Sequence, residues 1–176
     1  MENIKWIFDK NAKTNEWYVL KNKFYIDSLD DVFVDITSLG VYILYINGTL
    51  VSRGPVKSFD YCKGYYSVDV SPFVKNGKNE ITIFSHKIED SGVFARVYTK
   101  DKMIVVTDES WKIKRYEALL PDTIVLCPPL EPICRSEEHF DANADADILM
   151  ESYDYSQWQN AEYMDTCNTG IEKSLP

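Results

Sequence analysis

The sequence predicts an all-β fold of the β-sandwich type. Short apolar runs alternate with polar residues, as in half-buried strands, and turn residues recur about every 8–12 positions. No stretch has the length and period of an ordinary helix, which favours a sandwich or barrel. The 176 residues include 4 Trp, 12 Tyr and 8 Phe, types that pack well on a pleated surface. We expect one domain with roughly nine to eleven strands.

The clearest signals lie within residues 41–85. Tyr42–Ile46 is a run of aromatic and β-branched residues, and Asn47-Gly48 follows it. Both turn residues accept positive φ, which makes this the strongest short hairpin signal. Thr49–Ser52 is the expected return strand, and Arg53-Gly54-Pro55 ends it because proline cannot continue a sheet ladder. Asn47 also opens a glycosylation sequon, but the turn geometry alone accounts for this asparagine.

A second pair of strands follows. Tyr65–Val70 is the third strand of this stretch, and Ser71-Pro72 is typical of a helix N-cap followed by proline at the first helical position. Phe73–Lys75 is then expected to form one helical turn, closed by Asn76-Gly77 in left-handed geometry. Glu80–Ser85 alternates its apolar residues and is the fourth strand.

The remaining strands are predicted from the same alternation, bounded by polar turns. They are Lys5–Phe8, Trp17–Ile26, Val32–Thr37, Val93–Thr99, Met103–Thr107 and Trp111–Tyr116.

Composition changes after Ala118. Residues 119–135 hold four of the seven prolines and are expected to be irregular. Residues 136–147 are acidic, with room for one helical turn, and Tyr153–Ala161 is expected to be a turn anchored by a tryptophan. Residues 165–176 show no periodicity and resemble the start of a linker.

Charge and apolar content exclude several partner classes. The formal net charge is −9, and no basic cluster is longer than a pair, so neither nucleic acid nor an anionic membrane surface is an expected partner. No apolar run approaches the ~20 residues of a membrane span, and no signal peptide is visible, which favours a cytoplasmic location. The cysteines Cys62, Cys127, Cys134 and Cys167 form no C-x-x-C motif, and we expect idle thiols rather than a zinc site.

Catalytic motifs are absent from the sequence. The chain has 28 acidic residues, most of them in expected turns, where aspartate caps backbone NH groups. His86 and His139 are the only histidines, and neither a G-x-S-x-G nor a phosphate-loop motif occurs. We expect no catalytic residues in this chain.

One acidic stretch has a spacing like that of a calcium loop. Asp141, Asn143, Asp145 and Asp147 alternate, but the glycine and distal glutamate of an EF-hand are missing. Asp141, Asn143 and Asp145 remain candidates for another kind of calcium site, and the alternative is a solvated acidic loop. No other cofactor is expected.

Arg53 and Asp69 form the most informative polar set. An arginine that leaves one strand and an aspartate on the next suggest a charge-assisted pair that fixes residues 54–64. The functional alternative is a carbohydrate site lined by Arg53, Tyr65 and Tyr66, with Asp69 nearby.

Five motifs, in this order, resemble the N-terminal domain of bacterial α-L-rhamnosidases and related large glycoside hydrolases. They are YILYINGTLVSRGP, YYSVDVSPFVKNGKNEITI, VVTDESWKI, HFDAN and YDYSQWQNA. The whole match spans about residues 4–165. The family pattern D-A-R reads Asp141-Ala142-Asn143 here, D-D-S reads Asp154-Tyr155-Ser156 and G-R-G-P reads Ser52-Arg53-Gly54-Pro55. Because position 143 is an asparagine, any role that the arginine of D-A-R has in the family does not transfer to this chain.

The resemblance implies a galactose-binding-like antiparallel jelly roll over residues 1–165, followed by a linker over 166–176. In the family this domain precedes further β-domains and a catalytic (α/α)₆ barrel that carries the catalytic acids. The implied partners are therefore the downstream catalytic and β-domains of the same polypeptide. Some related jelly-roll modules bind rhamnose or other sugars with calcium.

Three hypotheses follow. The first is a non-catalytic accessory domain that supports or positions the catalytic domain of a glycoside hydrolase. The second is a carbohydrate-binding module for rhamnose or a related sugar, with calcium as an optional ligand. The third is a free-standing structural or adhesion protein.

Overall fold

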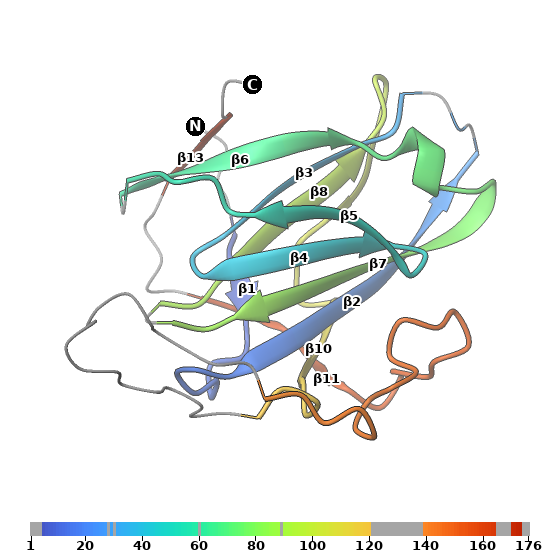
Figure 1. Cartoon of the computed structure of the whole chain (residues 1–176). Helices are drawn as coiled ribbons and strands as arrows, with labels where there is room; N and C mark the ends of the chain where they lie inside the picture. The colour runs from blue at the N-terminus through green and yellow to red at the C-terminus, as the bar shows by residue number, and fades with distance from the viewer. Residues whose placement is uncertain are drawn as a thin grey trace.

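The protein is a sandwich of two stacked β-sheets (Figure 1). The computed structural model describes residues 5–27, 29, 31–59, 61–88, 90–120, 139–164 and 170–173. Within these residues it has thirteen strands, one short 3₁₀ turn and no α-helix. No helix in this part of the chain is long and apolar enough to cross a membrane. The all-β prediction is confirmed. The strand number exceeds the expected range because three short strands, at 159–160, 162–163 and 170–173, were not predicted.

The first sheet has seven strands, in the order β12-β1-β8-β3-β6-β13, with β9 paired to β8. Its strands are β1 (Ile7–Phe8), β3 (Phe33–Ser38), β6 (Cys62–Asp69), β8 (Val93–Tyr98), β9 (Met103–Val106), β12 (Glu162–Tyr163) and β13 (Gly170–Lys173). All its pairs are antiparallel except β13 with β6, which are parallel.

The second sheet has six antiparallel strands, in the order β11-β10-β2-β7-β4-β5. Its strands are β2 (Trp17–Ile26), β4 (Val41–Ile46), β5 (Thr49–Gly54), β7 (Gly77–His86), β10 (Lys112–Arg115) and β11 (Gln159–Asn160). β2 and β7 pair over their whole length, from Trp17↔His86 to Ile26↔Gly77. Figure 1 shows β4, β7 and β2 in front of β3 and β8 of the first sheet.

The core fills the space between the two sheets. Alternation along each strand sends every second side chain inward, and these side chains are apolar. Tyr42, Leu44 and Ile46 of β4 are all fully buried. The indoles of Trp6 and Trp111 are also buried, and Trp111 Nε1 donates to the carbonyl of Val106 at 3.0 Å.

The Asn47-Gly48 hairpin forms as predicted, with φ of 49° and 76°. The Asn47 side chain forms hydrogen bonds within the protein through both its nitrogen and its oxygen. Its amide nitrogen donates to the Phe73 carbonyl at 2.9 Å, and its oxygen accepts from the backbone of Glu80 at 3.0 Å. These bonds tie the hairpin to β7, and they support the geometric interpretation of this asparagine.

The short helical turn is shifted from its predicted position. It spans Ser71–Phe73, and its N-cap residue is Val70, which makes no side-chain cap bond. The prediction that Ser71 is the N-cap is wrong, because its hydroxyl instead accepts from the backbone nitrogen of Val32 at 3.0 Å. Gly77 has the predicted positive φ, +88°, but it does not close the turn, which ends in the extended residue Val74, and Gly77 is the first residue of β7.

Part of the segment interpreted as a linker belongs to the sheet. Residues 170–173 form β13, whose parallel register sets Gly170 opposite Cys62 and Lys173 opposite Tyr65. No strand was predicted there, because backbone pairing at a sheet edge needs no apolar pattern. The proline-rich residues 121–138, with Cys127 and Cys134, lie outside the described residues, as does Cys167.

Candidate docking and carbohydrate-binding surfaces

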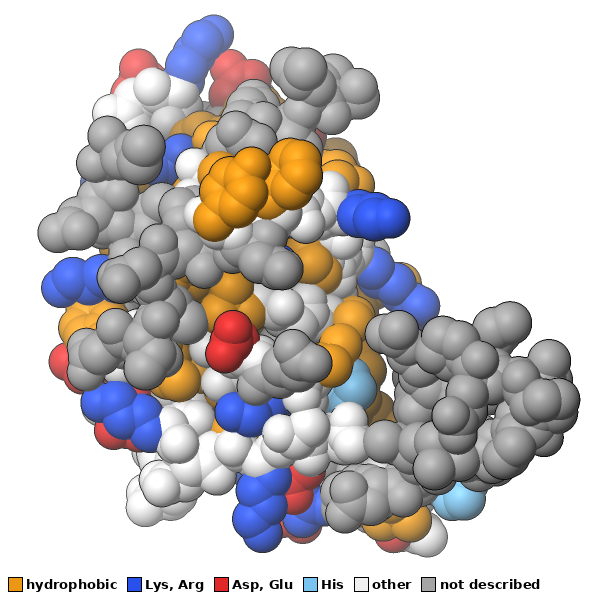
Figure 2. Space-filling view, turned by 90° about the vertical axis from the view of Figure 1, so that its left-hand side faces the viewer, with side chains coloured by type: hydrophobic (Ala, Val, Ile, Leu, Met, Phe, Trp, Pro, Cys, Tyr) orange, Lys and Arg blue, Asp and Glu red, His pale blue; other side chains and the backbone are white. Residues whose placement is uncertain are grey.

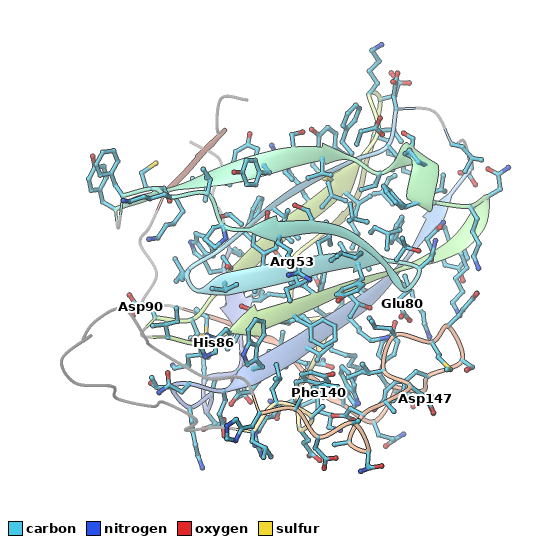
Figure 3. All side chains as sticks on the ribbon, in the orientation of Figure 1. Arg53, Glu80, His86, Asp90, Phe140 and Asp147 are labelled. Atoms are coloured by element: carbon cyan, nitrogen blue, oxygen red, sulfur yellow. The ribbon has the colours of Figure 1, made fainter. Side chains whose placement is uncertain are left out.

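The four candidate sugar-site residues are divided between the two sheets. Arg53 is exposed on β5 and lies over the sheet that faces the viewer in Figure 3. Tyr65, Tyr66 and Asp69 are on β6 in the other sheet. The chain crosses between sheets after β5, so no ion pair joins Arg53 to Asp69 within the described residues. Asp69 instead accepts from the backbone nitrogen of Ser71 at 2.9 Å. Hydrogen bonding to the side chain of Ser71, and then to its backbone, lowers the pKa of the Asp69 carboxyl group.

Tyr65 lies beside a polar network on the outer face of the seven-stranded sheet. The guanidinium of Arg96 is 5.8 Å from its ring centroid. Arg96 Nε also donates to Asp35 Oδ2 at 2.8 Å, and the Tyr98 hydroxyl donates to Asp35 Oδ1 at 3.1 Å. The Asp35 residue is only 1% exposed, so its charge depends on these donors. Because neighbouring strand residues face opposite ways, Tyr66 lies on the other face of the sheet, and the two tyrosines do not form one surface.

The outer face of the six-stranded sheet carries an aromatic cluster. Phe84 contacts Tyr45 and Tyr116, with ring centroids 5.5 and 4.8 Å apart. Ile148, from the segment of residues 141–158, packs against the same cluster and is 2% exposed. Nearby, His86 stacks on Trp17 with centroids 5.0 Å apart. The imidazole therefore lies against an indole ring.

A buried ion pair lies under the same segment. Lys21 Nζ is 2.6 Å from Glu80 Oε1, and the two side chains are 0% and 8% exposed. The ring of Tyr155 is 5.2 Å from the Lys21 ammonium. Burial lowers the pKa of Lys21 and raises that of Tyr155. Sequence reasoning missed this pair, whose only signal is a lysine in the apolar part of the predicted strand Trp17–Ile26.

In the acidic stretch of residues 141–147, the carboxylates of Asp141 and Asp145 accept hydrogen bonds from other groups of the protein. Asp145 Oδ1 is 2.8 Å from Lys114 Nζ, and its Oδ2 accepts from the backbone of Glu117 at 3.2 Å. Asp141 Oδ1 accepts from the backbone nitrogen of Asn143 at 2.9 Å. In the described ranges, His, Cys, Asp and Glu side chains nowhere gather in a group of three that would hold a metal ion. A calcium site at this turn stays a prediction.

One small hollow brings two carboxylates to its walls. Glu80 and Glu151 both line it, with Lys23, Lys78 and two asparagines. Its volume is about 10 Å³, which is barely enough for one water molecule. Glu80 pairs with Lys21, and Glu151 pairs with Lys75 at 2.7 Å. A glycosidase mechanism requires space for a sugar between two acids. This hollow has no such space.

Two further features expose aromatic rings to solvent. Phe59 and Tyr61 are 65% and 73% exposed and stack on each other with centroids 5.3 Å apart. They lie in the β5–β6 loop, on the left in Figure 1, and Figure 2 shows hydrophobic side chains gathered on that side of the molecule. Tyr25, 66% exposed, lines a hollow of about 140 Å³ at one end of the sandwich. None of the three was among the predicted site residues.

Solved structures with a similar fold include α-L-rhamnosidases and a lectin. The GH78 family rhamnosidase of Bacillus sp. GL1 superimposes with a TM-score of 0.82 over 96% of this chain, at 21% identity. The α-L-rhamnosidase of Dictyoglomus thermophilum gives a TM-score of 0.78 over 99% of this chain, at 20% identity. This chain shares its fold with a segment of α-L-rhamnosidases. The sequence resemblance to that family is therefore confirmed at the level of the fold.

The segment is a minor part of each rhamnosidase. The chain spans about a fifth of their length, 19% and 22% of the two chains. A lectin of Pleurotus ostreatus in complex with GalNAc has the same fold class, with a TM-score of 0.59 and 14% identity over 98% of this chain. Neither the models of protein families nor the curated proteins give a match to the sequence.

Proposed function

We propose that this chain is a non-catalytic accessory domain of a larger α-L-rhamnosidase-like glycoside hydrolase. The observation that carries the proposal is the coverage. Rhamnosidases match 96–99% of this chain, while the chain matches only 19–22% of theirs. The domain's role is to support or position a catalytic domain on the same polypeptide.

The state of the acidic side chains supports a non-catalytic role. A retaining or inverting glycosidase needs two carboxyl groups on opposite sides of a sugar ring, about 5–9.5 Å apart, with space between them. Two of the buried acids, Asp35 and Glu80, are each bound to a cation, Arg96 and Lys21 respectively. The ion pairs hold these two carboxylates in structural roles.

Exposed apolar side chains support a docking role. A stacked aromatic pair of the kind formed by Phe59 and Tyr61 is costly to expose and typical of the centre of an interface. Downstream catalytic and β-domains are the partners proposed for this domain.

The direct test is the reading frame of the native gene beyond Pro176. A frame that continues into a helical-barrel domain supports an accessory role. A stop codon at that point contradicts it and favours the free-standing alternative.

The second candidate function is carbohydrate binding. The specific observation in its favour is the lectin of the same fold class in complex with GalNAc. Calorimetric titration with rhamnose, galactose and plant oligosaccharides, with and without calcium, tests it. Absence of heat across the whole panel counts against it.

A further inference from the structure

We propose that the hollow at one end of the sandwich binds a single neutral pyranose residue, either a monosaccharide or one residue of a glycan. The hollow is lined by Tyr25, Ile26, Asp27, Thr99, Lys102 and Ile104. The inference rests on the second candidate function and assigns it to a place on the molecule that differs from the predicted sugar-site residues.

Both sheets contribute to the hollow. Tyr25 and Ile26 are the last residues of β2 in the six-stranded sheet, and Asp27 follows them. Thr99 and Lys102 belong to the turn between β8 and β9 of the other sheet. This turn is closed by two backbone hydrogen bonds, from Thr99 N to Lys102 O at 2.9 Å and from Lys102 N to Thr99 O at 3.4 Å. The residues that line the hollow therefore lie at the hydrogen-bonded ends of the two sheets.

The size of the hollow fits one sugar ring. Its volume is about 140 Å³, whereas one water molecule needs about 10–15 Å³ on the same measure. Ile26 is 2% exposed and provides an apolar floor, whereas Tyr25 is 66% exposed. A concave site with an apolar floor and a few convergent polar groups is the usual form of a small-molecule site.

Two charged side chains lie at the rim. The side chains of Asp27 and Lys102 make no ion pair within the described residues, although both lie at the same opening. Their neighbours behave differently, since Lys100 Nζ lies 3.6 Å from Asp31 Oδ2. Among the described residues neither the carboxylate nor the ammonium has an ionic partner, so both can bind a ligand with donors and acceptors.

A pyranose satisfies each of these groups. Its hydroxyls donate to the Asp27 carboxylate and accept from the Lys102 ammonium, and its C–H face packs against an aromatic ring. The charges of Asp27 and Lys102 cancel, and the chain carries a net charge of −9. Both facts disfavour an anionic ligand such as a phosphate and favour a neutral one.

The test is an NMR titration of the whole ¹⁵N-labelled chain with L-rhamnose and, separately, with N-acetylgalactosamine. We expect saturable shifts of the backbone amides of Tyr25, Asp27, Thr99 and Ile104 with at least one of the two sugars. Tyr25→Ala and Asp27→Asn are each expected to weaken binding about tenfold or more, because each removes one contact of the size of an aromatic or charge-assisted interaction.

Tyr61→Ala is the matched control. It removes an equally exposed tyrosine, 73% exposed, from a loop that does not line the hollow, and is expected to leave affinity unchanged. Two results overturn the inference: no saturable shift with either sugar, or shifts that cluster at Phe59 and Tyr61 and are lost in Tyr61→Ala. Neither result bears on the accessory-domain proposal, which the reading frame tests independently.

Discussion

Lys21 and Glu80 form a salt bridge of 2.6 Å that is closed off from solvent on the outer face of the six-stranded sheet. The Thr82 hydroxyl donates to the same carboxylate oxygen at 3.5 Å, and Tyr155 places its ring over the ammonium. A buried charge costs several kcal/mol unless it is paired. The covering segment of residues 141–158 and the ion pair therefore depend on each other.

We predict that Glu80→Gln destabilises the protein by about 3–5 kcal/mol, because it leaves the Lys21 ammonium buried without a counter-charge. Urea unfolding measures the change. Glu151→Gln is the matched control, since it breaks a pair of 2.7 Å with Lys75 at the surface and should leave the unfolding midpoint almost unchanged. Equal effects of the two substitutions would show that the pair is solvated.

A second prediction concerns alkaline unfolding. Burial, and then the hydrogen bond to Glu16 at 2.7 Å, raises the pKa of Tyr18 to about 12. In the unfolded chain the tyrosine pKa is about 10. The folded state therefore holds this proton more tightly. The corresponding stability is fully present below pH 10 and is lost as the pH rises towards 12.

Tyr18→Phe should flatten the loss of unfolding free energy between pH 10 and pH 12. Tyr25→Phe, at an exposed position on the same strand, should retain the wild-type dependence. Urea titrations at half-unit pH steps measure both slopes. Identical slopes for wild type and Tyr18→Phe would contradict the assignment.

The third prediction tests the contact between the hairpin and the covering segment. Gly48 and Gly77 both have positive φ, +76° and +88°. A Cβ at Gly48 would lie 2.7 Å from the carbonyl oxygen of Leu149, whereas one at Gly77 would meet nothing within 4 Å. Gly77→Ala should cost about 1 kcal/mol from backbone strain, and Gly48→Ala should cost about 1–3 kcal/mol more. Equal costs by thermal unfolding would mean that the segment does not contact the hairpin.

The fourth prediction compares the stability contribution of an exposed aromatic ring with that of a buried one. Phe59 is 65% exposed, while Phe84 is 6% exposed. Phe84→Ala should therefore lose about 3–5 kcal/mol of stability, and Phe59→Ala about 0.5 kcal/mol or less. A large loss for Phe59→Ala in denaturant unfolding would assign that ring to the structure rather than to an interface.

Sequence periodicity predicted the long strands well, because alternation reports directly on which face of a strand is buried. Trp17–Ile26 has the predicted bounds, and the Asn47-Gly48 turn has the predicted geometry. β13 was not predicted, since backbone hydrogen bonds along an edge strand leave little trace in the choice of side chains.

The candidate site was harder to predict for a related reason. Arg53 and Asp69 are close in sequence, but a crossover between the sheets places them apart. The hollow lined by Tyr25 and Lys102 combines residues far apart in the chain, and only the stacking of the sheets brings them together. Local patterns contain no information about that stacking.

This domain shares its fold with a segment of α-L-rhamnosidases, and the central proposal is that it does not hydrolyse glycosides. The most direct measurement is release of p-nitrophenol from p-nitrophenyl α-L-rhamnoside by the purified 176-residue chain. We expect no release above that of a heat-denatured sample, even at high protein concentration and over the full pH range of stability. Turnover proportional to protein concentration, and abolished by substitution of a single carboxylate, would contradict the account.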